Sequence, residues 1–405
     1  HTLRGFSPSV GLPSEVATSR HSCFFPMASD PSQLTIQFQP ECRLDVIDVN
    51  QHIEAETEEF LHAHQKALYC SYHTTAGYIE ETICKRLDRH PEQVQEFIAP
   101  FRELFPFGAD YQHDQLHLRK ELSPEQRQTE PRNADSHLTF IGTVLENCVT
   151  YPSDPSRPVF FVDLDGINKD NQDRRERRTT VIGYDEERVV DETELEVPVS
   201  DHPIDSVSLR DPRLGIFDQL HEMLAERGIT TGRVTIDLAP DEQHAGLTVN
   251  EYETLLMKHD LAEVLRDPLR FMAEKGRNML SDPGAIPGKA KNYAKYDLVR
   301  LVNKVVDTLG LSESLVERII DKCLAVPAER FLRMKRSVRL LVTEDPANGE
   351  GTIVQGRYQS PTLVQWRKSE LQARSLNVNV TRVGRLGVWG WVFGTCSSVL
   401  VIRYS

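Results

Sequence analysis

The sequence has no CxxC pair, and its seven cysteines are scattered and odd in number. A zinc ribbon needs closely spaced cysteine pairs and a disulfide framework needs cysteines that pair off, so the sequence favours neither. Free thiols in a reducing compartment are the simplest interpretation, which predicts a cytoplasmic protein. The cysteines are Cys23, Cys42, Cys70, Cys84, Cys148, Cys323 and Cys396.

Positive charge is also scarce. The chain carries 47 lysines and arginines against 61 aspartates and glutamates, which gives a net charge of −14. A protein that binds nucleic acid as its main partner needs a basic face to meet the phosphates. We therefore expect no nucleic-acid partner, although a local anion site is compatible with this charge.

Long hydrophobic runs are nearly absent. No secretory hydrophobic segment occurs near the beginning, and residues 1–32 are predicted to be a disordered extension rather than a transit peptide. Residues 386–402 carry no charge and reach the lower limit of a membrane span. Their glycines and serines make a poor span, so we predict a disordered tail over residues 371–405 and no membrane partner.

With 405 residues the chain could hold two or three domains of usual size. Residues 33–200 mix strand-like and helical patterns, and they end in an acidic stretch at 186–196 that is interpreted as the exit of the first domain. After Pro203 the apolar spacing becomes helical, notably at residues 250–259, 261–280, 296–309 and 314–324. The prediction is an α+β domain followed by a mostly α-helical domain of unknown role over residues 203–370.

Local patterns also predict individual elements. Residues 34–39 alternate as a strand does, and residues 42–49 can form the hairpin partner of that strand. Residues 50–67 are predicted to be helical, as are residues 91–104, where Pro91 lies in the first turn. Residues 336–343 and 351–357 are predicted to form a second hairpin.

Three histidines, His73, His113 and His137, lie at or beside apolar runs. Neutral imidazole is the commonest metal ligand, and three histidines with an open position make a catalytic type of zinc site. Their spacing is not diagnostic by itself, because single histidines are more often structural or solvent-facing. His62 and His64 are two residues apart on a predicted helix, face different sides, and are expected to be solvated.

The segment HTTAG at residues 73–77 resembles the opening signature of the YjbQ family, a group also labelled secondary thiamine-phosphate synthase. The features that follow occur in the order of that family, and the resemblance covers roughly residues 34–190. These features are a Y-x-H-D segment at residues 111–114, an A-x-S-H segment at 134–137, a strand at 160–165 and an arginine-rich strand at 177–182.

The resemblance implies an α+β fold with antiparallel sheet and a homotrimer. It also implies a divalent metal ion, most simply zinc, bound by His73, His113 and His137, and a weak ability to join a pyrimidine pyrophosphate to a thiazole phosphate. Two departures point to a changed substrate. Residues 113–117 read HDQLH where the family has H-N-[DE]-G, and residues 160–166 read FFVDLDG where it has G-T-W-Q-G.

Several arginines could bind a phosphorylated substrate. Arg177 and Arg178 begin a strand, so one of them should point inward and neutralise charge as a leaving group departs. Arg174 and Arg175 are better explained as a solvated hairpin tip.

Small polar residues lie nearby in the sequence. Thr74, Thr75 and Asp135 are candidates for positioning the substrate or for supporting the metal ligands, or they cap the turns in which they lie. The first hypothesis is therefore a metal-dependent enzyme that acts on a phosphorylated small molecule, with Asp135, Arg177 and Arg178 as its catalytic candidates.

Two other functions are compatible with the residues. One is a non-catalytic, metal-stabilised trimeric binding or scaffold module whose C-terminal part recruits a partner. The other follows from the DxDG segment after a buried strand, which resembles motif one of haloacid-dehalogenase-type phosphatases. Asp163 would then be the nucleophile and Asp165 the general acid. The downstream lysine and acidic pair that such an enzyme needs are not evident.

Overall fold

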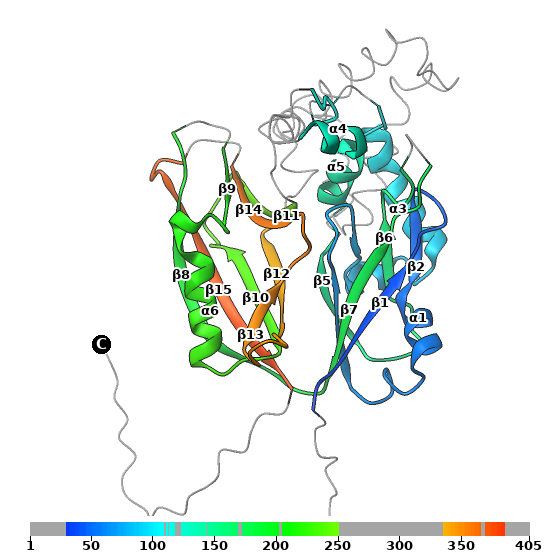
Figure 1. Cartoon of the computed structure of the whole chain (residues 1–405), viewed down its shortest axis with the longest axis horizontal. Coiled ribbons are helices and arrows are strands. Elements are labelled where there is room, and N and C mark those ends of the chain that lie inside the picture. The colour runs from blue at the N-terminus through cyan, green and yellow to red at the C-terminus, as the bar shows by residue number, and fades with distance from the viewer. Residues whose placement is uncertain are drawn as a thin grey trace, which may run out of the picture.

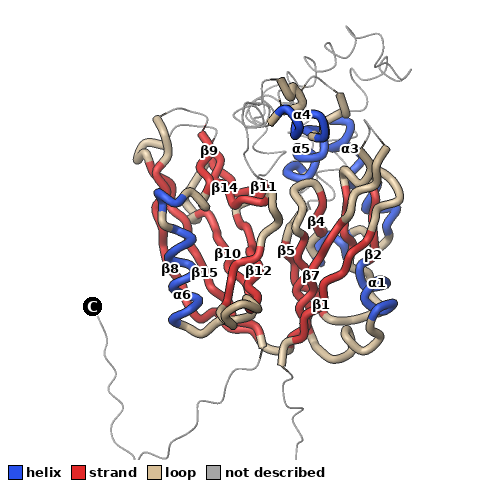
Figure 2. Tube along the Cα trace, viewed as in Figure 1, coloured by secondary structure: helices blue, strands red, loops and turns tan. Residues whose placement is uncertain are grey.

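The computed structural model describes residues 30–108, 111, 113–117, 123–143, 145–168, 172–201, 205–250, 335–365 and 369–384. Its strands form two bodies that lie side by side, each built from two antiparallel sheets with few helices (Figures 1 and 2). We call them the first domain, up to residue 184, and the second domain, from residue 187 to residue 384.

The first domain contains a four-stranded sheet of order β1-β7-β3-β5 and a three-stranded sheet of order β2-β6-β4. Its strands are β1 (Ser32–Phe38), β2 (Asp45–Asp48), β3 (Lys66–Ser71), β4 (Ala76–Tyr78), β5 (Cys148–Pro152), β6 (Phe160–Asp163) and β7 (Arg177–Tyr184). Its helices are α1 (Val49–Glu56), α2 (Glu81–Arg86), α3 (Pro91–Leu104), α4 (Pro124–Thr129) and α5 (Ala134–Gly142).

Local chemistry explains where several of these elements begin. Pro91 occupies the first turn of α3, where its missing N–H has no partner to lose, and the predicted helix over residues 91–104 is confirmed. Ser123 starts α4 with a capping box in which it and Gln126 satisfy each other's backbone N–H groups. The helix predicted over residues 50–67 is shorter than expected, since α1 ends at Glu56.

The second domain contains a five-stranded sheet of order β13-β12-β10-β15-β8 and a three-stranded sheet of order β11-β14-β9. Its elements are β8 (Glu187–Pro198), β9 (Asp205–Ser208), the 3₁₀ helix η1 (Pro212–Leu214), α6 (Ile216–Glu226), β10 (Gly232–Leu238), β11 (Ala245–Asn250), β12 (Ser337–Glu344), β13 (Gly351–Val354), β14 (Gln359–Gln365) and β15 (Ala373–Val383).

The second domain repeats the topology of the first. The strand order β8-β15-β10-β12 matches the order β1-β7-β3-β5 of the larger first-domain sheet. The order β9-β14-β11 likewise matches β2-β6-β4, and matching strands follow one another along the chain in the same order. In both domains a helix follows the second strand, α1 in the first and α6 in the second. The strand β13 is an addition at the sheet edge. The described chain is therefore a tandem repeat of one fold.

The prediction of a mostly helical second domain is wrong, because its described residues are rich in strands. The acidic stretch read as a domain exit is β8, an edge strand whose exposed face accommodates its charges. The predicted tail overlaps β15, whose residues alternate between buried and half-buried as a one-sided strand requires. The helices predicted between residues 250 and 324 and the uncharged run 386–402 lie outside the described residues.

The predicted hairpin of residues 34–39 and 42–49 is also wrong. β1 pairs with β7 and β2 pairs with β6, so the short connection between them carries the chain from one sheet to the other. The hairpin near the end of the chain is confirmed as β12 and β13. Within the described ranges, no helix has both the length and the apolar character needed to cross a membrane.

The two domains meet through an apolar cluster and a set of polar contacts. Five residues of the cluster come from β3, β5 and β7, and two come from β12 and β15. They are Leu68, Cys70, Cys148, Ile182, Tyr184, Leu341 and Val383. Beside it Lys335 lies 3.3 Å from the Glu146 carboxylate, and the Asn147 amide donates to the Arg339 carbonyl oxygen at 2.6 Å.

Truncating Leu341 tests whether this junction stabilises the whole protein. Leu341 is fully buried in the cluster, so Leu341→Ala should lower the free energy of unfolding by about 3 kcal/mol through lost burial and a residual cavity. Leu371 is 84% exposed, and Leu371→Ala is the matched control. The measurement is chemical denaturation of both variants. Equal stability of the two variants would show that the junction contributes little.

Candidate functional site

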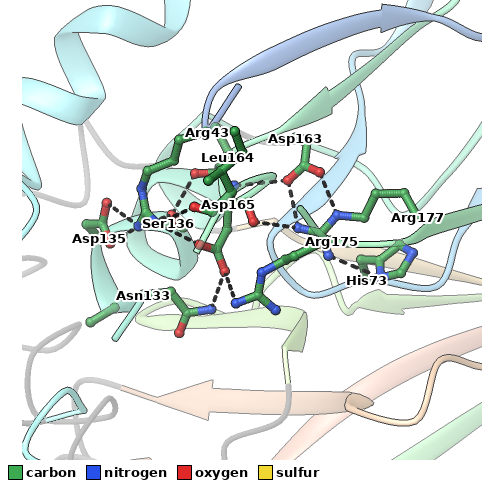
Figure 3. Close-up of polar contacts among 12 residues, drawn as sticks. Arg43, His73, Asn133, Asp135, Ser136, Asp163, Leu164, Asp165, Arg175 and Arg177 are labelled. Atoms are coloured by element: carbon green, nitrogen blue, oxygen red, sulfur yellow. Dashed lines mark hydrogen bonds and ion pairs between the residues drawn. The ribbon is translucent and has the colours of Figure 1, made fainter. Parts of the chain in front are cut away.

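A buried ion pair joins the two sheets of the first domain. Asp163 ends β6 and is completely buried, and Arg177 begins β7. The Arg177 Nε and Nη2 atoms donate to the two carboxylate oxygens of Asp163 at 2.5 and 2.8 Å (Figure 3). Nη2 also donates to the backbone carbonyl oxygen of Asp165 at 3.0 Å. The guanidinium is thus held along one edge by β6 and the turn after it.

Asp165 is the second centre of this ionic network (Figure 3). Its carboxylate accepts from Arg43 Nη1 at 2.7 Å and from the Asn133 amide at 2.8 Å, and it pairs with Arg175 Nη2 at 2.7 Å. Arg43 also reaches Asp135 in α5, at 2.9 and 3.1 Å to the two oxygens. The network therefore ties α5 and the loop before β2 to the end of β6.

The charges of this network balance. Three guanidinium groups, of Arg43, Arg175 and Arg177, face three carboxylates, of Asp135, Asp163 and Asp165. Burial raises the pKa of Asp135 to about 6, against the opposing effect of Arg43. Burial also raises the pKa of Asp165, which Arg175, Arg43 and Arg177 oppose. Paired in this way, the network leaves little net charge inside the domain.

His73 lies just after β3 and is neutral. Its Nε2 accepts a hydrogen bond from the backbone N–H of Arg178 at 2.9 Å, and its Nδ1 lies 3.4 Å from Arg177 Nη1 (Figure 3). Burial lowers the pKa of His73 to about 3, and the nearby charges of Arg177, Arg178 and Arg175 add to that effect. A ring with so low a pKa is uncharged at physiological pH, and its Nε2 lone pair is used by the Arg178 N–H.

The three predicted metal ligands do not gather as one group. The rings of His113 and His137 lie close together, with centroids 5.2 Å apart, and His113 Nδ1 lies 3.0 Å from the Asp114 carboxylate. His73 does not fit a metal ion, because Nε2 already accepts a backbone hydrogen bond and guanidinium groups surround the ring. In the described part of the chain, no three His, Cys, Asp or Glu side chains are arranged to hold a metal.

Arg178 points away from the network, as alternation along a strand requires. Its side chain is exposed, and its guanidinium lies 4.7 Å from the ring centroid of Tyr72. No carboxylate of the described residues forms an ion pair with it. The prediction that one of the two arginines points inward is correct: Arg177 is the buried one. Thr75 is buried and its carbonyl accepts from the Leu164 N–H at 3.0 Å, whereas Thr74 is half-buried.

The predictions that Arg175 and His64 are solvated are wrong. Arg175, expected at an exposed tip, belongs to the network through Asp165. Arg174 is exposed as expected, and its Nε donates to the Pro40 carbonyl oxygen at 2.6 Å. His64 is buried, its Nε2 lies 2.6 Å from the Ser32 hydroxyl, and burial lowers its pKa. The helix expected to contain His64 ends at Glu56. The two-residue spacing of His62 and His64 therefore could not predict the exposure of His64.

Sequence analysis did not identify Arg43 and Asn133, which supply two contacts to Asp165. No short motif contains them. Only general chemistry indicated that such partners exist. Asp163 and Asp165 follow a fully apolar run and are expected to be buried, and buried carboxylates need cationic partners. That argument predicts partners without saying which arginines they are.

The second domain contains a counterpart of the central ion pair. Ser71 ends β3 and faces Thr179 of β7, and Leu238 ends the equivalent strand β10 and faces Leu376 of β15. Arg177 lies two residues before Thr179, and Arg374 lies two residues before Leu376, so the two arginines occupy equivalent positions. Ala76 faces Asp163 and Ala245 faces Gln365, so Gln365 occupies the position of Asp163. The repeat therefore keeps the arginine and replaces the carboxylate that faces it.

The contacts follow this correspondence. Arg374 Nε donates to Gln365 Oε1 at 3.3 Å, and Nη1 donates to the Glu242 carboxylate at 2.7 Å. In the first domain Nη1 of Arg177 faces His73, and in the second domain Nη1 of Arg374 donates to Glu242. Glu242 therefore takes the place that His73 has beside Arg177. The fold keeps a buried arginine in both domains, whereas the residues around it differ.

Asp163 does not fit the role of a phosphatase nucleophile. Its Oδ1 accepts from the Asp165 N–H at 2.9 Å and from Arg177, its Oδ2 accepts from Arg177, and the residue has no exposed surface. A nucleophile must reach the phosphorus atom with a free oxygen lone pair. Asp163 is therefore a structural residue in this arrangement.

Replacing Asp163 tests this conclusion. Asp163→Asn should lower the free energy of unfolding by about 3 kcal/mol, because it leaves the buried charge of Arg177 without its partner. The exposed Asp218 offers the control Asp218→Asn, which should change stability by less than about 0.5 kcal/mol. Denaturant unfolding measures both. An Asp163→Asn protein as stable as the control would contradict a structural role for the pair.

No model of a known protein family matches the chain, and no curated protein matches it. A solved YbjQ-like protein of unknown function from Sulfolobus solfataricus P2 aligns with 49% of this chain and 99% of its own, at 16% identity and a TM-score of 0.25. A hypothetical protein from Aeropyrum pernix K1 aligns with 38% of this chain and 97% of its own, at 23% identity and a TM-score of 0.23.

A third solved structure is an uncharacterized conserved protein of the YjbQ family from Clostridium acetobutylicum. It aligns with 46% of this chain and 98% of its own, at 13% identity and a TM-score of 0.24. YjbQ-like structures thus align with about half of this chain at low sequence identity.

Proposed function

We propose that the first domain binds a phosphorylated small molecule beside His73, with Arg178 as its phosphate contact. The observation that carries this proposal is the state of Arg178. It is an exposed guanidinium, fixed against the Tyr72 ring and without a carboxylate partner among the described residues. Arg177 and Arg175 pair with buried carboxylates, and Arg174 donates to backbone carbonyl oxygens. The exposed Arg178 guanidinium, by contrast, can offer two parallel N–H groups to a phosphate.

The neighbouring groups support binding of an anion. The buried network is close to neutral, so it does not repel one, and His73 is uncharged and adjoins the backbone of Arg178. In a transfer reaction, Arg178 would neutralise charge on a departing phosphorylated group. Arg177 is less suited to that task, because it is buried and its Nε and Nη2 already donate to Asp163 and to the Asp165 carbonyl oxygen.

Removal of Arg178 tests the proposal. Arg178→Ala should weaken binding of inorganic phosphate about tenfold, since a hydrogen-bonded charge contact contributes about 1.5 kcal/mol or more. Arg210→Ala is the matched control, because Arg210 is also exposed and lies over an aromatic ring, 5.5 Å from the centroid of Phe217. Isothermal titration calorimetry at low salt measures both. Equal phosphate affinity of the two variants would overturn the proposal.

The metal ion implied by the YjbQ resemblance would be held by His113 and His137, whose rings adjoin. When bound, such a metal would polarise phosphate oxygens. The expected homotrimer, the scaffold role and the cytoplasmic location stay predictions.

The metal content of variants tests whether His113 and His137 bind the metal ion without His73. His113→Ala should lower the zinc content of the purified protein, because it removes one of two adjoining imidazoles. His73→Ala should leave the zinc content unchanged, because that ring is committed to Arg178. Elemental analysis of the two variants decides. An equal loss of zinc in both would restore His73 as a ligand.

A further inference from the structure

The segment between β13 and β14 in the second domain makes a tight turn at residues 356–359. The backbone N–H of Gln359 donates to the carbonyl oxygen of Gly356 at 3.0 Å, which closes a four-residue turn. The backbone N–H of Gly356 donates to Gln359 Oε1 at 3.1 Å, so side chain and backbone brace each other. Arg357 and Tyr358 are the two central residues of this turn.

The turn is docked on the His73 segment of the first domain. Gln359 Nε2 donates to the backbone carbonyl oxygens of Ser71 and His73, both at 3.0 Å, and Gln359 is buried. At the other end of the turn, a Cβ on Gly356 would overlap the carbonyl oxygen of Tyr72. Only glycine permits this approach. The turn is therefore fixed against residues 71–73 at both of its ends.

Two similar pairs of side chains flank this contact. The Arg178 guanidinium lies over the buried ring of Tyr72, and the Arg357 guanidinium lies 5.2 Å from the ring centroid of Tyr358, which is 51% exposed. Arg357 is exposed, and no carboxylate in the described ranges pairs with it. Arg178 thus lies over Tyr72, and Arg357 directly follows the Gly356 that is docked on Tyr72. Each guanidinium contacts an aromatic ring, and neither has a carboxylate partner among the described residues.

We infer that Arg357 of the second domain and Arg178 of the first together bind one ligand that carries two phosphate groups. This inference rests on the proposed function and extends it: the site would lie across the domain junction and need both copies of the fold. Guanidinium groups match phosphate oxygens in a forked geometry, and contact with a ring restricts their motion before the ligand arrives.

A purely structural explanation of the turn accounts for Gly356 and Gln359. It does not account for the side chain of Arg357, which is exposed and contributes nothing to docking beyond its contact with Tyr358. Substitution at Arg357 therefore separates the two explanations without disturbing the junction.

The experiment titrates the full chain with inorganic pyrophosphate and, separately, with inorganic phosphate by isothermal titration calorimetry. Arg357→Ala should weaken pyrophosphate binding about tenfold and phosphate binding much less, because only pyrophosphate offers a second charged group. Arg178→Ala should weaken both. Arg357→Lys keeps the charge without the fork, so it should lie between the wild type and Arg357→Ala. Arg210→Ala should match the wild type, and thermal melting should show that all variants are folded.

The outcomes are distinguishable. Pyrophosphate affinity unchanged in Arg357→Ala, while Arg178→Ala loses affinity, overturns the two-domain site and leaves the proposed function intact. A wild-type protein that binds neither probe overturns both. Equal losses of pyrophosphate and phosphate affinity in Arg357→Ala would also count against the inference, since they would indicate general charge rather than a second contact.

Discussion

The first domain depends on the buried pair of Arg177 and Asp163. Two separate sheets must be held together where β6 ends and β7 begins, and a guanidinium that donates along one edge to a carboxylate fixes both distance and orientation. Burying these charges is costly, and the ion pairs that surround them offset the cost. Asp165 with Arg43 and Arg175 extends that pairing to α5 and to the loop before β2.

The ion pair of Arg177 and Asp163 also determines which groups reach the surface beside His73. Because Arg177 points inward, strand alternation turns Arg178 outward, and the backbone of Arg178 holds His73 as a neutral ring. Burial, helped by the guanidinium groups nearby, lowers the pKa of His73, and the same guanidinium groups make the ring a poor partner for a cation. The strand thus places a buried structural arginine and the proposed phosphate contact at consecutive positions.

The sequence predicted elements that are governed by local chemistry. Pro91 in a first turn predicted α3 with its bounds, and the strands expected at residues 160–165 and 177–182 correspond to β6 and to most of β7. Long-range partners could not be found in this way. Arg43 meets Asp165 across 122 residues and Asp135 across 92, and only the sheet topology brings them together.

The second domain was missed for a different reason. Its strands are separated by a long segment with helical spacing, residues 251–334, which dominated the interpretation of the pattern. The alternation of Leu376, Val378 and Val380 with polar residues in β15 was a readable strand signal, but it fell where a tail was expected. A repeat whose copies share topology but few residues leaves little trace in a single sequence.

The side chains of the two repeat copies can diverge, because the contact between the domains depends on their shared fold. In the second domain the position of Asp163 is held by Gln365, and Glu242 supplies the opposing charge from the side that faces His73 in the first domain. That carboxylate would repel an anion at the equivalent place. The second domain contributes elsewhere, through a turn that holds the carbonyl oxygens of Ser71 and His73. Among the described residues, the arrangement therefore favours one shared anion site over two equivalent ones.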